Sequence, residues 1–196
     1  MVMKQKKGAQ GIGTLIIFIA MILVAAVAAG VLIQTASSLQ SKSLDVGRQS
    51  QEKITTDIEV IQVYASDTSD GSINNSGDDN VTLVVRLGSG SSPVKLDDLL
   101  LRFDTMAGTQ SVTYSGGATF SDESYGIDYK VNGSNHLDDY LNVGDLAEIE
   151  FTYNSTNSIA EGETATIRLL TKNGAVKPVQ LTTPSAMTSV ITYLYP

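Results

Sequence analysis

The chain has 196 residues, a mass of 20.8 kDa, no cysteine and one histidine, which excludes disulfide bonds, thiol catalysis, zinc fingers and histidine-rich metal centres. This length is enough for one domain with an appendage. The net charge is −8, and the 21 acidic residues all follow position 42, so the body of the chain is acidic and is not expected to bind nucleic acid.

The first predicted element is an apolar helix near the N-terminus. No charged residue occurs from Gly8 to Ser41, and the segment Ile12–Ile33 contains only three non-apolar residues. As a helix, these 22 residues would be about 33 Å long, enough to cross the hydrocarbon core of a bilayer. Three lysines precede the segment, so the N-terminus is predicted to stay in the cytoplasm and everything after Gln34 to lie outside.

Three kinds of processing are consistent with such a segment. An ordinary secretory signal would be cut after Ala28, where Ala26-Val27-Ala28 is an acceptable site. A plain membrane anchor would not be cut at all. The third possibility is a signal that is cut in front of the apolar segment and leaves that segment on the mature protein. The residues just before the segment favour this third possibility.

Small residues surround this junction. Gly8, Gly11 and Gly13 disfavour a rigid helix, and a protease needs an extended backbone at the bond that it cuts. The alternative is that these glycines are merely flexible residues in front of a membrane helix.

The run from Lys6 to Ile16, KKGAQGIGTLI, resembles the class III leader junction of archaellins, the archaeal flagellins. The resemblance implies that a membrane-embedded preflagellin peptidase recognises Lys6 and Lys7, cuts after Gly8 and leaves Ala9 as the mature N-terminus. The tail, with EGETATIRLL from Glu161 and a later Thr-Thr-Pro, is also similar to the archaellin C-terminal region.

One position separates branches of the wider pilin superfamily. Bacterial type IV pilins usually have Glu at the fifth mature residue, which is Gly13 here. An uncharged residue favours the archaellin branch. Archaeal adhesion pilins share a similar leader and remain an alternative.

The helix is predicted to extend from about Gln10 to about Gln51. We therefore divide the chain into a cleaved leader (1–8), a hydrophobic helix that forms the filament core (9–52) and an outer domain (53–196). After cleavage the helix would leave the lipid and pack against copies of itself, because its many small residues allow close approach of backbones. The predicted self-assembly residues are Gly11, Ile12, Gly13, Leu15, Ile16, Phe18, Ile19, Ile22, Leu23, Val27, Val31 and Leu32.

After Ile54 the pattern changes to the alternation typical of strands. Nine short strands with turn residues between them predict an antiparallel, immunoglobulin-like β-sandwich, so the fold class is α+β. The predicted strands are Asp57–Tyr64, Val81–Leu87, Leu99–Phe103, Gln110–Tyr114, Tyr125–Val131, Ala147–Tyr153, Thr164–Thr171, Val176–Thr182 and Val190–Tyr195.

Four Asn-x-Ser/Thr sequons occur in the predicted outer domain, each in or beside a predicted loop. They are Asn74, Asn80, Asn132 and Asn154. Archaellins are commonly N-glycosylated, so the resemblance implies that at least one of these sites carries a glycan. Without it, these residues would be ordinary turn asparagines.

No catalytic motif is found, and no cofactor is expected beyond such glycans. Asp67 and Asp70 lie in an oxygen-rich loop that offers weak support for a structural calcium ion, but the full spacing of a calcium-binding loop is missing, and solvated acids are the simpler interpretation. His136 is predicted to be a surface loop residue.

These patterns together predict the structural subunit of an extracellular filament, made as a membrane-inserted precursor. The resemblance implies a helical homopolymer, possibly shared with related archaellins, that serves swimming and possibly adhesion. It also implies two assembly partners, a cytoplasmic ATPase and a membrane platform. The alternative from a different class is a membrane-anchored β-sandwich that binds a ligand, which would be monomeric and would keep Lys4, Lys6 and Lys7. An enzyme is not expected.

Overall fold

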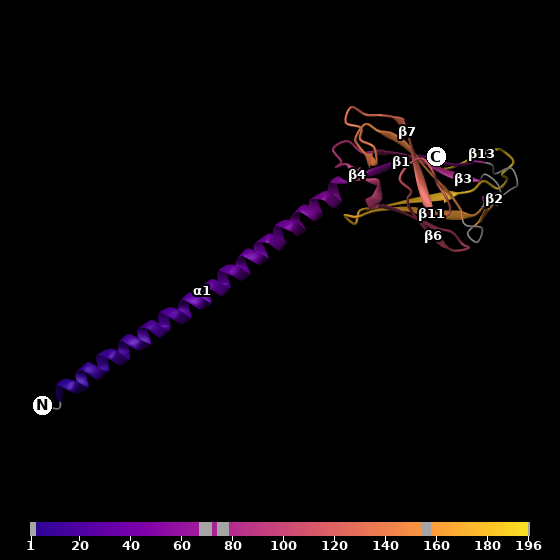
Figure 1. The fold of residues 1–196 in the computed structure, drawn as a ribbon. Helices are drawn as coiled ribbons and strands as arrows, with labels where there is room; N and C mark the ends of the chain where they lie inside the picture. The colour runs from indigo at the N-terminus through magenta and orange to yellow at the C-terminus, as the bar shows by residue number, and fades with distance from the viewer. Residues whose placement is uncertain (1–2, 67–71, 74–78, 154–157, 196) are drawn as a thin grey trace. The chain divides into compact units, whose positions relative to one another are not determined.

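The computed structural model describes residues 3–66, 72–73, 79–153 and 158–195, and describes side chains from residue 10 onward. The chain forms two compact units, residues 1–49 and residues 50–196. The first unit is helical, and the second contains all the described strands (Figure 1).

One helix, α1 (Met3–Thr55), forms the described part of the first unit, and its last residues belong to the second unit. It is longer at both ends than predicted. It begins before Gly8 rather than at about Gln10, so the glycines that we expected to disfavour a rigid helix at the cleavage site are helical here. Each glycine costs only about 1 kcal/mol relative to alanine, which a long run of good helix formers can offset. At the other end, Thr56 donates its backbone N–H and its hydroxyl to the carbonyl of Glu52, which closes the last turn.

The nine predicted strands are all present, and each boundary lies within two residues of the prediction. They are β1 (Ile58–Ser66), β3 (Asn80–Leu87), β5 (Leu99–Asp104), β6 (Thr109–Tyr114), β7 (Ser124–Val131), β9 (Leu146–Thr152), β11 (Thr164–Thr171), β12 (Val176–Thr182) and β13 (Ile191–Tyr195). The prediction missed four two-residue strands and a short 3₁₀ helix, which are too brief to show a periodic pattern. These are β2 (Ser72–Ile73), β4 (Val94–Lys95), η1 (Leu96–Asp98), β8 (Tyr140–Leu141) and β10 (Ile159–Ala160).

The nine strands form a sandwich of two layers. One layer has the order β13-β1-β3-β9-β7 and the other β12-β11-β5-β6, and a short pairing of β6 with β7 joins them. All pairs are antiparallel except β6 with β7, which is parallel. The α+β fold with a β-sandwich is therefore confirmed, and the parallel pair is the feature that the alternation pattern did not predict.

Aromatic side chains fill the space between the layers. Phe103 of β5 packs against Phe151 of β9, with ring centroids 5.9 Å apart, and edge-on against Tyr153 at 4.5 Å. All three side chains are buried. The Tyr125 hydroxyl lies within hydrogen-bond distance of the carbonyl oxygens of Leu96 and Leu99, so this buried hydroxyl has acceptors for its proton. This core holds the two layers together, so the residues on their outward faces have fixed positions.

Candidate assembly and modification sites

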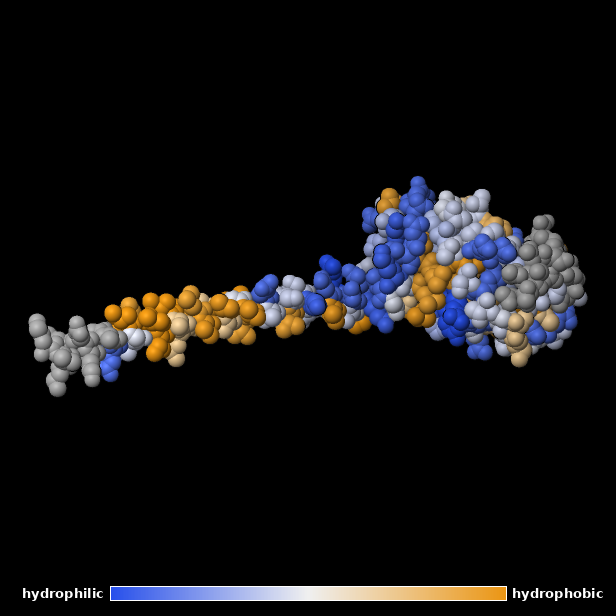
Figure 2. Space-filling view, turned by 60° about the horizontal axis from the view of Figure 1, so that its bottom comes forward, coloured by the Kyte–Doolittle hydropathy of each residue, from blue (hydrophilic) through white to orange (hydrophobic). Residues whose placement is uncertain are grey.

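The apolar segment of α1 is exposed along its length in the part of the chain that the structure describes. Its large side chains from Ile12 to Ile33 are all exposed by half or more of their surface. Figure 2 shows this hydrophobic surface along the N-terminal part of the helix, with a more polar surface farther along. A helix that is apolar on all sides is stable only in lipid or inside a protein assembly.

The apolar surface surrounds the helix rather than forming one stripe. The five consecutive residues Leu15–Ile19 are all exposed, and consecutive residues of a helix point in directions about 100° apart. Ten of the twelve predicted self-assembly residues have exposed side chains on this surface, and the other two are Gly11 and Gly13. The predicted set does not include Ile17, Met21, Val24 and Ile33, which are 64–72% exposed on the same surface. The uninterrupted apolar sequence was the signal that could have identified them.

The hydroxyl groups in and beside this segment are satisfied locally. Thr14 donates to the carbonyls of Gln10 and Gly11, and Thr35 donates to those of Val31 and Leu32. Such bonds leave no free donor to be solvated. By length and composition this helix could cross a membrane. The same surface is therefore suited both to lipid and to a bundle of helices.

The predicted cleavage residues Lys6, Lys7, Gly8 and Ala9 all lie within α1. The extended backbone that we expected at the Gly8–Ala9 bond is thus helical in this structure. Cleavage there would require local unwinding, for which the nearby glycines lower the cost.

The two sequons within the described residues have different surroundings. Asn80 is the first residue of β3, and Thr82 of the same sequon is a buried strand residue. Asn132 follows β7 in a loop, and both it and Ser134 are exposed. Asn74 and Asn154 lie outside the described residues. The expectation that the sequons lie in or beside loops therefore fits Asn132 best.

Asp67 and Asp70, the weak calcium candidates, lie outside the described residues. Among the residues that the structure describes, no group of three or more His, Asp or Glu could hold a metal ion. The calcium site stays a prediction.

His136 lies in a loop, as predicted, but its side chain is more buried than that of an ordinary surface residue. Its side chain is only 18% exposed, its Nδ1 lies 3.4 Å from Oδ2 of the fully buried Asp145, and its ring packs edge-on against Tyr129. The Asp145 carboxylate also accepts the backbone N–H groups of Gly133 and Asn142, at 2.7 and 3.0 Å. The histidine thus helps to fix the loop between β7 and β9, a role that a single sequence position does not reveal.

A row of acids crosses the outward face of the first layer. Glu148 lies 3.2 Å from the Lys130 ammonium, which also binds Asp128 at 2.7 Å. Burial, reinforced by the charge of Glu148, raises the pKa of Glu150 above its usual range. Burial also raises the pKa of the nearby Tyr64. These groups form a structural network with no nucleophile or paired acid and base that would indicate catalysis.

The sequence matches the family described as archaeal-type flagellin over residues 8–181. Flagellin A1 of Haloferax volcanii is 33% identical over 93% of this chain and 92% of its own length. Flagellin B1 of Methanococcus voltae is 31% identical over 98% of this chain and 97% of its own.

Two solved structures share the fold. The archaeal flagellum of Methanospirillum hungatei aligns with 93% of this chain and 98% of its own, with a TM-score of 0.66 and 17% identity. The crystal structure of archaeal flagellin FlaB1 from Methanocaldococcus jannaschii aligns with 71% of this chain and 97% of its own, with a TM-score of 0.60 and 17% identity. From the sequence match across most of its length, the chain belongs to the archaeal-type flagellin family.

Proposed function

We propose that this chain is the structural subunit of an archaellum filament for swimming motility, and that it polymerises through the apolar surface of α1. The observation that carries the proposal is the exposure of every large apolar side chain from Ile12 to Ile33 in a chain of this family. Burying these 14 side chains against other copies supplies a favourable free energy for assembly outside the membrane. The role is structural and needs no active site.

Maturation would prepare the helix for this role. Cleavage after Gly8 removes Lys4, Lys6 and Lys7, so the first charged side chain of the mature chain is Lys42. A helix without charge over this length can then be withdrawn from lipid into a bundle. Lipid is as apolar as leucine, so moving the helix from lipid into a bundle changes the free energy of apolar burial very little. Withdrawal from the membrane therefore requires an external energy source. An assembly ATPase and a membrane platform would supply it.

The proposal is tested by intact mass and N-terminal sequencing of protein sheared from cells. We expect the mature chain to begin at Ala9. A start at Ala29 would mean that the helix is discarded, and the assembly argument would fail. A start at Met1 in a monomeric protein would instead support the membrane-anchored binding module.

A substitution at the junction gives a second test. Replacing Gly8 by a bulky residue should leave uncleaved precursor in the membrane and yield no filaments. Gly47 serves as a matched control, because it lies in the same helix far from the junction and an added side chain meets nothing within 4 Å. Normal filaments from the Gly8 variant would contradict the proposed cleavage site.

We also propose that Asn132 carries an N-linked glycan on the filament surface. The exposure of Asn132 and Ser134 supports this assignment, whereas the burial of Thr82 disfavours Asn80. Mass spectrometry of filament peptides should show added mass on the Asn132 peptide that Asn132→Gln removes. Added mass on the Asn80 peptide, with an unmodified Asn132, would overturn the assignment.

A further inference from the structure

The dipeptide Asn-Gly occurs twice in the chain, as Asn132-Gly133 and as Asn173-Gly174. In such a pair the backbone nitrogen of glycine can attack the side-chain amide of asparagine, because glycine has no side chain that hinders the approach. Both pairs lie within the described residues, and both asparagines are exposed. The sequence alone therefore gives the two sites similar reactivity.

The reaction is deamidation, and its co-reactant is water. Hydroxide removes the proton of the glycine N–H, and the nitrogen forms a bond to Cγ of asparagine. The bond from Cγ to Nδ2 then breaks, and the leaving nitrogen takes a proton from water to become ammonia, which regenerates hydroxide and leaves a succinimide ring. Water opens this ring to aspartate or, at the other carbonyl, to isoaspartate. The glycine N–H must therefore leave its hydrogen-bond acceptor and turn toward the side chain.

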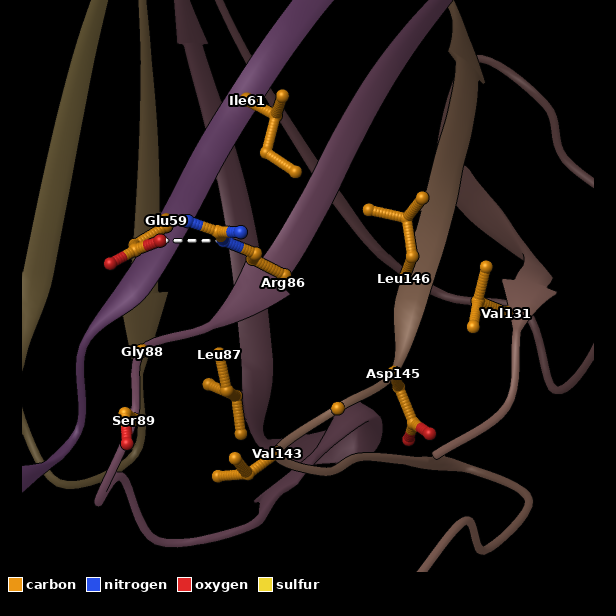
Figure 3. Close-up of a pocket in the computed structure, with 11 residues that line it drawn as sticks. Glu59, Ile61, Arg86, Leu87, Gly88, Ser89, Val131, Val143, Asp145 and Leu146 are labelled. Atoms are coloured by element: carbon orange, nitrogen blue, oxygen red, sulfur yellow. Dashed lines mark hydrogen bonds and ion pairs between the residues drawn. The ribbon is translucent and has the colours of Figure 1, made fainter. Parts of the chain in front are cut away.

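The Gly133 N–H is held by a buried carboxylate. It donates to Oδ1 of Asp145 at 2.7 Å, and the Asp145 side chain is fully buried. The pocket drawn in Figure 3 includes Asp145, at the entry to β9, and Val131, the residue before Asn132. Hydrogen bonds to ionised groups are stronger than those between neutral groups, and breaking this one leaves a buried charge with one donor fewer.

The backbone around Gly133 is also closely packed. A Cβ atom at Gly133 would lie 2.9 Å from the carbonyl carbon of Gly144 and 3.1 Å from the carbonyl oxygen of Val143. The Gly133 carbonyl accepts the backbone N–H of His136 at 3.2 Å. Turning the peptide toward the side chain of Asn132 would disturb both contacts.

The Gly174 N–H lies in an exposed turn instead. Lys172 and Asn173 form the tip of the β11–β12 hairpin, and β12 is an edge strand. The Gly174 N–H donates to the Thr171 carbonyl at 2.8 Å, a neutral acceptor that water can satisfy when the turn opens. Among the described residues, a Cβ atom at Gly174 would meet only Nζ of Lys53, at 3.8 Å. The turn can therefore open without leaving a buried charge unsatisfied.

We propose that Asn173 deamidates in the folded chain and that Asn132 is protected, with Asp145 as the protecting residue. Local opening exposes each glycine N–H to hydroxide, and the fold makes this opening rarer at Gly133 than at Gly174. We expect deamidation at Asn132 to be about tenfold slower than at Asn173. The reaction needs neither filaments nor a glycan, so its outcome is independent of the proposed function.

Deamidation at Asn173 would change the hairpin itself. Isoaspartate lengthens the backbone by a methylene group in a turn where the Thr171 N–H donates to the Ala175 carbonyl at 3.0 Å. It also adds a negative charge beside Lys172. The modification would thus weaken the pairing of β11 with β12.

The test uses the full chain, produced in a host without N-glycosylation and kept folded in mild detergent. After incubation at mildly alkaline pH, mass spectrometry of peptides and enzymatic methylation of isoaspartate give the rate at each site. The same chain unfolded in guanidinium chloride is the control, and there we expect similar rates at the two sites. A folded-state rate at Asn132 that equals or exceeds that at Asn173 would overturn the proposal.

Asp145→Asn tests the protecting residue. The variant replaces the carboxylate with a neutral amide of similar shape, so Asn132 should deamidate several-fold faster while the rate at Asn173 stays unchanged. Glu148→Gln is the matched control, because the Glu148 carboxylate lies in the same layer and binds Lys130 instead. An unchanged rate at Asn132 in folded Asp145→Asn would contradict the role of Asp145.

Hydrogen exchange of the wild-type chain provides the measurement if Asp145→Asn does not fold. Both glycines follow asparagine, so their N–H groups have the same intrinsic exchange rate, and any difference reports the opening of the fold. We expect the Gly133 N–H to exchange about tenfold more slowly than that of Gly174. Equal exchange rates would overturn the proposal.

Discussion

At the scale of single residues, Gly126 shows how a backbone approach fixes a residue type. A Cβ atom added to this residue of β7 would lie 2.6 Å from the Ala118 carbonyl oxygen and 2.9 Å from that of Thr119. The neighbouring Ile127 N–H donates to the Gly117 carbonyl at 2.9 Å, which holds the same loop against the strand. Only glycine allows this loop to cover the outward face of β7.

We therefore expect Gly126→Ala to destabilise the outer domain. Displacing the loop backbone should cost about 1–3 kcal/mol, which for a domain of this size lowers Tm by about 2–10 °C. Thermal unfolding followed by circular dichroism provides the measurement. Ser111→Ala, an exposed site on β6, is the control and should change Tm little. An unchanged Tm for Gly126→Ala would show that the loop can move at no cost.

A second prediction at this scale concerns Glu150. Burial raises the pKa of Glu150 in the folded state above that in the unfolded chain, so folding favours the protonated form of its carboxyl group. Its contribution to stability is then fully present below the pKa of the unfolded chain and is lost as the pH rises through the folded-state pKa. Glu150→Gln removes this loss, so the variant should have a higher Tm than wild type at pH 7 and about the same Tm at pH 4.

Thermal unfolding at the two pH values provides the measurement. Glu123→Gln, an exposed position near β7, is the matched control and should show no such gain. A Tm for Glu150→Gln at pH 7 that equals or falls below that of wild type would contradict the prediction.

At the scale of elements, the assembly helix can be tested without making it more polar. A Cβ atom at Gly30 would meet nothing within 4 Å in the single chain, so Gly30→Leu should leave the isolated helix and its insertion into lipid intact. In a bundle, however, the larger side chain would separate backbones that small residues bring together. We expect at least a tenfold loss of filaments, counted by electron microscopy of cell surfaces.

The neighbouring Val31→Leu provides the control, because it adds one methylene group at a position that is already large. Normal filaments from Gly30→Leu would show that Gly30 faces away from other subunits. Loss of the precursor from the membrane fraction would instead show that the substitution acts on insertion.

At the scale of the whole molecule, the two units depend on different interactions. The outer domain has its own hydrophobic core, whereas the described apolar side chains of α1 are exposed within the first unit. In mild detergent, which disperses filaments and shields the helix, the outer domain should keep its cooperative thermal transition. Gly30→Leu should leave that transition unchanged, and Gly126→Ala should lower it. A shift of the domain transition in Gly30→Leu would show that the units are coupled in stability.

The sequence by itself determined the elements that local patterns specify. A charge-free apolar run defines α1, and alternation over five to eight residues defines the nine long strands. It also determined the family, through residues at the junction around Gly8. It placed the helix ends poorly, because the cost of a glycine in a helix is small compared with the gain from its neighbours.

Only the tertiary structure decided which segments meet. The parallel pairing of β6 with β7 and the contact of His136 with the buried Asp145 both join separate strands or loops of the chain. Such contacts depend on strand order and register, for which the alternation within one strand carries no information. For the same reason the sequence listed four equivalent sequons, and the fold separated the exposed Asn132 from Asn80, whose threonine is buried in a strand.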